Sequence, residues 1–294
     1  MKIVHRSGCA AALAVPLLLA GCSLLPTTRH LPVPKATTVK SATPQELVNQ
    51  INQSWDALHS MTAKVEIQAT EFKTAEGLEK DEPTIRGIIV MGKPKKLRVV
   101  GTDFAVRVFD MASDGNHFTL VIPPEHLAFE GSSTVTEKDP EHPFYDIRPN
   151  FFLDALAVRG LDPGNEYMVA GDSETIEDPS RKHLYIEQEY TLSVMLPKAG
   201  PEKLPLRVIT FHRDDMLPYD QDVYDSQGNL ETQITYRNYA AYGAVKYPSR
   251  ITVKCPQEGV QFVLTVDDVQ ENVPVTDDQF QVKIPAGTTI KHLK

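Results

Sequence analysis

The fold is decided by a stretch that begins at Ala63 and reads Ala-Lys-Val-Glu-Ile-Gln-Ala up to Ala69. Apolar and polar residues alternate in it, and a β-strand directs successive side chains to opposite faces of its sheet. The stretch therefore predicts a strand with one buried face and one solvated face, which is typical of antiparallel sheets.

Similar runs continue along most of the chain, separated by turn signals such as Asp114-Gly115 and Glu258-Gly259. Strands that follow one another without crossover helices favour a single antiparallel sheet that curves strongly. The other expected strands lie at 84–91, 96–100, 104–111, 116–122, 126–130, 183–195, 205–212, 219–225, 230–239, 247–255, 260–269 and 280–284.

Two helices are expected beside this sheet. The first begins at Thr43-Pro44-Gln45-Glu46, a capping box with proline at the first helical position, and continues to about His59. The second is expected from Asn150 to Gly160, with Asn150 capping its start and Gly160 its end. Its large apolar residues need an apolar partner. This second helix either packs on the sheet as ordinary core or forms a lid over a cavity, with Phe152 and Leu156 as the lid residues.

The chain begins like an exported protein. Lys2 and Arg6 precede an apolar stretch too short to cross a hydrocarbon core of about 30 Å. That stretch ends in Leu19-Ala20-Gly21-Cys22, which resembles the lipobox of bacterial lipoproteins. The resemblance implies cleavage between Gly21 and Cys22 and attachment of lipid to Cys22. The alternative is an ordinary signal peptide with a chance cysteine.

Residues 23–42 are rich in Pro, Thr, Ser and Lys and are expected to form a flexible tether. Ser23 follows the cysteine where Asp would resemble an inner-membrane retention signal, which favours the periplasmic face of the outer membrane. The expected organisation is a signal peptide at 1–21, the lipidated cysteine and tether at 22–42, and one folded domain at 43–294.

Charge and cysteine content exclude several classes of protein. Loss of Lys2 and Arg6 with the signal lowers the formal net charge from −9 to −11, which argues against a nucleic-acid partner. Cys9 leaves with the signal and Cys22 takes lipid, so Cys255 has no partner for an internal disulfide. The domain must therefore be stabilised by its core alone.

Enzyme motifs are missing from the sequence. It has no Gly-x-Ser-x-Gly elbow, no His-Glu-x-x-His helix and no phosphate-binding glycine loop. His212-Arg213-Asp214 is interpreted as a solvated turn. Pro-Glu-His occurs at 124–126 and 140–142, but without cysteines or a helical histidine pair it predicts no zinc site. We expect no catalytic residues, no metal and no cofactor.

The order of these elements resembles the LolA/LolB-like family of lipoprotein-sorting and lipid-carrier proteins. The resemblance implies an unclosed β-barrel in which short helices cover a hydrophobic cavity for acyl chains. A lipid anchor makes the chain more similar to the receptor LolB than to the soluble carrier LolA. The matching segments are Arg86–Pro94 with Leu97-Arg98-Val99, Ser113-Asp114-Gly115, Asn150–Gly160, Arg213-Asp214-Asp215 and Phe280–Gly287.

Two single residues acquire roles from this resemblance. Lys93 occupies the position of the arginine that latches the carrier's lid, so it is the latch candidate. Phe104 follows Gly101-Thr102-Asp103 in the loop where the receptor has an exposed leucine for membrane delivery. The alternative for Phe104 is a strand residue that faces the core.

If the curved sheet is hollow, side-chain alternation predicts its lining. Each buried methylene of an acyl chain would contribute roughly 0.8 kcal/mol. The alternative is that the same residues fill a solid core. The expected lining residues are Val65, Ile67, Ile89, Leu97, Val99, Val106, Val108, Phe118 and Leu120 in the first half and Ile209, Phe211, Ile234, Tyr236, Ile251, Val253, Phe262 and Leu264 in the second.

The favoured function is a monomeric, membrane-anchored lipoprotein that binds acyl chains of lipoproteins or phospholipids and helps deliver them to the outer membrane. A periplasmic lipoprotein carrier is an expected partner. One alternative is an envelope lipoprotein of the same fold that acts as a ligand sensor or as a structural or assembly factor. The other is an unrecognised hydrolase. A large apolar pocket under residues 150–160 favours the first, and a cleft with perturbed His or carboxylate groups favours the last.

Overall fold

The computed structural model describes residues 39–73, 76–133, 143–177, 184–197 and 203–293. The expected signal peptide, Cys22, most of the tether and the second Pro-Glu-His segment lie outside them. The chain divides into a large unit, residues 37–174 and 187–294, and a small one. The described part of the small unit is residues 175–177 and 184–186, within the strands β8 and β9.

One sheet of fifteen strands is formed by the described residues, in the order β15-β7-β6-β5-β4-β3-β1-β14-β13-β12-β11-β10-β9-β8, with β2 paired to β1. The strands are β1 (Ser60–Lys73), β2 (Leu78–Asp81), β3 (Ile85–Gly92), β4 (Lys96–Asp103), β5 (Val106–Ser113), β6 (His117–Ile122), β7 (Leu127–Ser132), β8 (Glu166–Glu177), β9 (Leu184–Leu196), β10 (Leu204–His212), β11 (Pro218–Tyr224), β12 (Leu230–Tyr242), β13 (Val245–Cys255), β14 (Val260–Glu271) and β15 (Thr289–His292).

The sheet is curved and unclosed, with β15 and β8 at its two edges, and this confirms the expected fold class. Strands far apart in the chain pair at two places: β1 with β14, which joins the two halves of the sheet, and β15 with β7. The pair of β15 with β7 is parallel, which departs from the expected antiparallel arrangement.

Three strands escaped the sequence pattern. β2 and β15 are short and exposed at every residue, and β8 becomes polar after Gly171, so none shows an apolar alternation. The strand expected at 280–284 was wrong. Phe280 instead ends a 3-10 helix, η4 (Asp277–Phe280), which Thr276 and Gln279 cap reciprocally. Two further 3-10 helices are η2 (Pro123–Glu125) and η3 (Pro143–Asp146).

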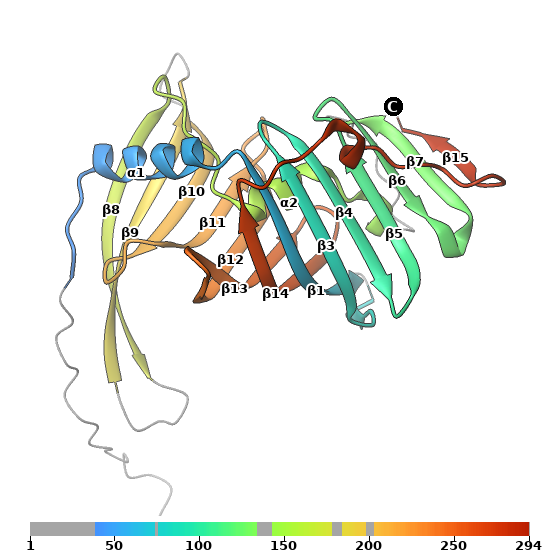
Figure 1. Ribbon diagram of the computed structural model, residues 1–294. Helices are drawn as coiled ribbons and strands as arrows, with labels where there is room; N and C mark the ends of the chain where they lie inside the picture. Colours follow the sequence, from blue (N-terminus) through green and yellow to red (C-terminus); the bar gives the residue numbers. More distant parts are fainter. Residues whose placement is uncertain (1–38, 74–75, 134–142, 178–183, 198–202, 294) are drawn as a thin grey trace, which may run out of the picture. The chain divides into compact units, whose positions relative to one another are not determined.

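The first helix, α1 (Pro44–Ala57), confirms the predicted capping box at Thr43. Figure 1 shows α1 beside β8, β9 and β10. Its buried residues form a second core with strand residues that include Ile209 and Phe211. The chain already contacts the domain before α1, because the Lys40 amide donates to the Arg213 carbonyl at 2.8 Å.

The second helix, α2 (Pro149–Leu156), is shorter than expected. The predicted caps were wrong. Arg148 is the N-cap and Pro149 the first helical residue, a position that suits the fixed φ of proline. Gly160 lies beyond the C-terminus, where an added Cβ would come within 2.6 Å of the Trp55 ring. A glycine is therefore needed at position 160 because the backbone packs closely against Trp55, and not because it caps the helix. Neither helix is long and apolar enough to cross a bilayer, as far as the described residues go.

Candidate functional site: an apolar cavity beneath the second helix

A cavity of about 670 Å³ lies between the strands of the first half, β14, η3 and α2. Its volume falls within the range of roughly 300–1,000 Å³ typical of small-molecule sites. The apolar part of its lining consists of Ile67, Ala69, Pro83, Ile85, Val108, Phe109, Met111, Leu120, Ile122, Pro143, Phe144, Tyr145, Ile147, Phe152 and Phe262.

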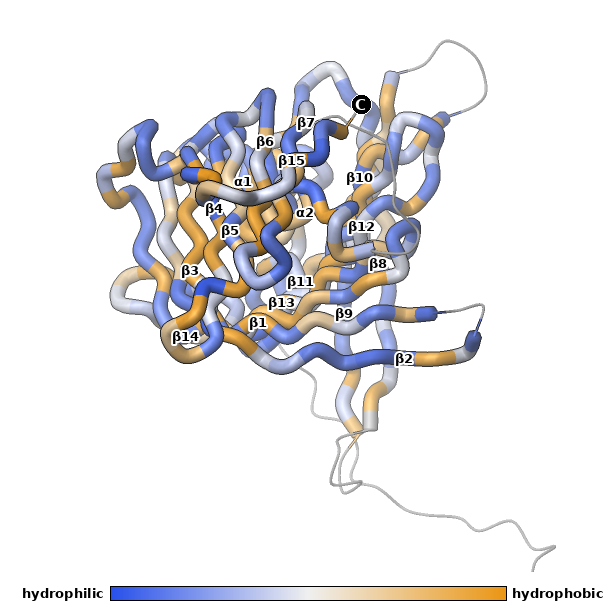
Figure 2. Tube along the Cα trace, turned by 90° about the vertical axis from the view of Figure 1, so that its right-hand side faces the viewer, coloured by the Kyte–Doolittle hydropathy of each residue, from blue (hydrophilic) through white to orange (hydrophobic). Residues whose placement is uncertain are grey.

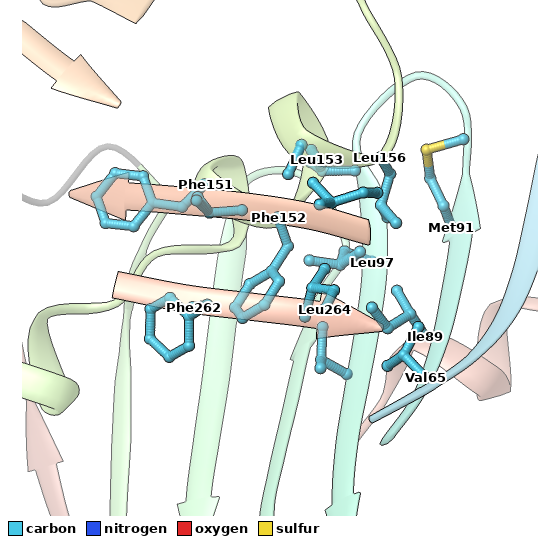
Figure 3. Packing of buried hydrophobic residues seen from close by; sticks show 14 of the residues in the cluster. Val65, Ile89, Met91, Leu97, Phe151, Phe152, Leu153, Leu156, Phe262 and Leu264 are labelled. Atoms are coloured by element: carbon cyan, nitrogen blue, oxygen red, sulfur yellow. The ribbon is translucent and has the colours of Figure 1, made fainter. Parts of the chain in front are cut away.

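Aromatic side chains form the roof of this cavity. Figure 3 shows Phe152 directed from α2 toward Phe262 and Leu264 of β14. The ring centroids of Phe152 and Phe262 lie 5.5 Å apart. Phe144, in η3, meets Phe262 edge-on at 6.2 Å. The roof therefore comes from two consecutive elements, η3 and α2, and both contact the same strand.

A buried ion cluster fixes the C-terminal half of α2. Asp154 is 3% exposed and accepts two hydrogen bonds from Arg159, at 2.6 and 2.7 Å. Arg207 of β10 donates to the same carboxylate at 3.2 Å. Burial lowers the pKa of Arg207, and the Asp154 charge opposes that shift. Removal of the carboxylate would leave the Arg207 charge buried without its acidic partner.

Three side chains of the sheet also donate hydrogen bonds to the C-terminal end of α2, which has no capping motif of its own. Tyr236 and Gln221 donate to the Asp154 carbonyl at 3.2 and 3.0 Å. Tyr247 donates to the Leu156 carbonyl at 2.7 Å. Complete burial raises the pKa of both tyrosines, so they remain protonated donors. These bonds satisfy carbonyls that a helix terminus would otherwise leave unpaired.

Lys93 is not the latch of this lid. Its ammonium donates to the Trp55 carbonyl at the end of α1 and lies 4.6 Å from the centroid of the Trp55 ring. A cation there suits the negative end of a helix dipole. Lys93 therefore contacts α1, whereas Arg207 of β10 contacts α2 through Asp154.

Neither a scan of protein-family models nor a search of curated proteins finds a match for this sequence. Solved structures do match. A LolA superfamily protein from Nitrosomonas europaea aligns over 82% of this chain and 99% of its own, at 15% identity and a TM-score of 0.50. A DUF1329 family protein from Desulfovibrio piger aligns over 81% and 95%, at 14% identity and a TM-score of 0.51.

The fold resembles that of this LolA superfamily protein. At such low identity the likeness concerns the fold alone, and it agrees with the resemblance found from the order of elements.

The LolA-like sheet is hollow only in part. Of the predicted lining, the cavity is bordered by Ile67, Val108, Leu120 and Phe262, together with the lid residue Phe152. Ile209 and Phe211 pack in the core under α1. The others fill the main core, where Leu156 also packs: Val65, Ile89, Leu97, Val99, Phe118, Ile234, Tyr236, Ile251, Val253 and Leu264.

Val106 was wrongly placed in the lining and is 62% exposed. The pairing of β4 with β5 shifts register between Gly101 and Thr102. Beyond this shift, Phe109 and Met111 border the cavity. Local periodicity did not predict η3 either, because a helix of four residues is too short to show a repeat. The available signal was Phe144, Tyr145 and Ile147, which are large apolar residues among polar neighbours.

Phe104 lies in the turn between β4 and β5 and is 96% exposed. Its φ of 49° is unusual for a bulky residue. The alternative that it faces the core is excluded. Leu78, at the start of β2, is a second exposed apolar residue, and Asp103 beside Phe104 lines the cavity. Exposed apolar groups thus occur next to the cavity's charged border.

Outside the cavity, His212 has two acidic neighbours and an aromatic one. Its ring lies between Glu187, 2.9 Å from Nδ1, and Glu189, 3.3 Å from Nε2, and it stacks on Tyr219. His212 ends β10 and is largely buried, so only the following residues form the expected turn. The two carboxylates contact opposite nitrogens of one ring, and the three residues form a group whose ligand atoms lie close enough together to hold a metal ion.

Proposed function

We propose that this protein is a membrane-anchored lipoprotein that binds acyl chains of lipoproteins or phospholipids and helps deliver them to the outer membrane. The observation that carries the proposal is the apolar cavity of about 670 Å³ beneath α2. An acyl chain needs no reactive group for its recognition, only apolar surface, and every ten methylenes buried would contribute roughly 8 kcal/mol before ordering costs.

The border of the cavity supports a delivery role. Phe104 and Leu78 are apolar groups with no chain to cover them, and such groups partition favourably into a membrane surface. Their neighbours Asp103 and Lys80 belong to the cavity border. An acyl chain that leaves the cavity on this side would therefore emerge close to the bilayer.

Anchoring and location rest on sequence features alone. Lipid on Cys22 would attach the domain to the periplasmic face of the outer membrane, with residues 23–42 as the tether. A periplasmic lipoprotein carrier would be the donor. The protein would act as a monomer, because the proposed site lies within one chain.

The test of binding uses the chain without residues 1–22, incubated with membranes and purified again, with mass spectrometry of the lipid that it retains. Titration with a fluorescent acyl probe that has an uncharged polar end then measures affinity. Ala69→Trp fills the cavity and is expected to weaken probe binding at least about tenfold. Ile88→Trp, on the solvent face of β3, is the matched control and should bind normally. If neither acyl lipid nor lipoprotein is retained and the probe does not bind, the proposal is wrong.

A second candidate is a ligand sensor or assembly factor that binds acyl chains without transfer. The observation in its favour is the firm attachment of α2, through Asp154 and the two tyrosines. A lid fixed in this way releases cargo slowly. Transfer of the probe from the loaded protein to lipid vesicles separates the two candidate functions. A carrier should transfer the probe within the time of a mixing experiment, and a sensor should retain the probe.

A further inference from the structure

The inner face of β1 changes from apolar to charged residues along its length. Val65, Ile67 and Ala69 alternate on the buried side, and the next two residues of the same alternation are Glu71 and Lys73. Both charged residues border the cavity. Figure 2 shows the neighbouring β2 as a largely hydrophilic segment. The cavity is therefore apolar inside and charged at one end, which marks where the polar part of a bound amphiphile would lie.

Both lysines of this charged end already have acidic partners. Lys73 lies 3.9 Å from Glu71, and Lys80 lies 2.5 Å from Glu82. The hydrogen bond that the Lys80 ammonium donates to Glu82 is the main cause that raises the pKa of Lys80, and the Glu71 charge adds to it. Neither lysine is thus available as an unopposed positive charge for an anionic ligand.

Two more carboxylates border the same cavity. Asp103 follows Leu97, Val99 and Gly101 in the inward alternation of β4. Glu125, at the end of η2, accepts a hydrogen bond from the Tyr145 hydroxyl, which is neutral. Four carboxylates and two lysines among the described lining residues leave the border with a formal net charge of −2.

We infer that the cavity selects amphiphiles whose polar part carries an ammonium group and disfavours those with a net anionic polar part. The inference rests on the proposed function and specifies its cargo. A ligand charge held about 9 Å from two carboxylates in water experiences a preference of about fivefold at low ionic strength. Salt screens groups that are this exposed, so the preference should largely disappear at about 1 M salt.

The experiment compares two lipids with the same single acyl chain, lysophosphatidylethanolamine and lysophosphatidylglycerol, as competitors of the uncharged acyl probe. Both carry a phosphate, and only the first carries an ammonium group. The first is expected to displace the probe at about one fifth of the concentration of the second. In the double variant Asp103→Asn with Glu125→Gln, this ratio should approach one, each displacing concentration being taken relative to the variant's own affinity for the uncharged probe.

The matched control is Glu66→Gln with Asp267→Asn, which removes two carboxylates that are exposed and do not border the cavity. It should keep the fivefold ratio, because only the local charges act. Equal displacement by both lipids, preference for the glycerol lipid, or an unchanged ratio in the Asp103 and Glu125 variant would overturn the inference while the proposed function stands. If neither lipid displaces the probe, the proposed function fails, and the inference fails with it.

Discussion

At the β4–β5 turn, the exposure of single side chains decides whether they face the core or the solvent. Sequence comparison directed attention to Phe104, but alternation in the same stretch also placed Val106 in the cavity lining. Both are exposed. Val106 is exposed, against the prediction from alternation, because the register shift near Gly101 separates the end of the β4–β5 hairpin from the covered part of β5. Phe104 and Val106 therefore form an uncovered apolar tip, suited to contact with a membrane.

The first prediction concerns Phe104. Phe104→Glu should slow acyl transfer to vesicles about tenfold and leave probe binding unchanged, because Phe104 does not line the cavity. Phe104→Gly should slow transfer as well. It should leave the free energy of unfolding equal or raise it by up to about 1 kcal/mol, since glycine accepts a positive φ without strain.

Denaturant unfolding and a vesicle transfer assay measure these two effects. Phe118→Ala is the control for a buried phenylalanine and should cost about 3–5 kcal/mol. A loss above 2 kcal/mol for Phe104→Gly, or normal transfer by Phe104→Glu, would contradict the assignment of Phe104 to membrane contact.

At the scale of elements, α2 was predicted as a helix but its attachment was not. Asp154 lies in the middle of an apolar segment, and the sequence offers no sign that its partner is Arg207, 53 positions further on. The latch expected from Lys93 depended on a matching position in a related fold. In this chain Asp154 of α2 pairs with Arg207 of β10, while Lys93 contacts α1.

The prediction for this element is that Asp154→Ala lowers the free energy of unfolding by about 3–5 kcal/mol, because Arg207 is left as an uncompensated buried charge. Asp220→Ala breaks an Arg–Asp pair of comparable geometry with Arg237 at the surface and should cost at most about 1 kcal/mol. Urea unfolding of both variants compares them. Similar small losses would show that Asp154 does not fix the lid through a buried charge.

At the scale of the whole molecule, stability must come from two cores and not from covalent links. The chain without residues 1–22 retains Cys255 alone, and this residue is fully buried. The melting temperature of this chain should therefore be the same with and without a reducing agent. An acyl ligand at about 100 times its Kd should raise the free energy of unfolding by roughly 2.7 kcal/mol. Calorimetry tests both statements. A lower melting temperature under reducing conditions would mean that stability depends on a disulfide between chains.

The sequence alone determined the curved antiparallel sheet, the start of α1 and the presence of an apolar second helix. Each depends on local periodicity or capping, and these act over a few residues. Strands with no buried face, such as β2 and β15, gave no such signal.

Only the tertiary structure decided which part of the sheet is hollow. Val65 and Ile67 have the same alternation, yet Ile67 borders the cavity and Val65 is packed in the core. The difference depends on where η3 and α2 rest, and that is set by Asp154, Arg207 and the buried tyrosines. Contacts between residues far apart in the chain leave no periodic trace in the sequence, so the filled and hollow regions look alike until the chain is folded.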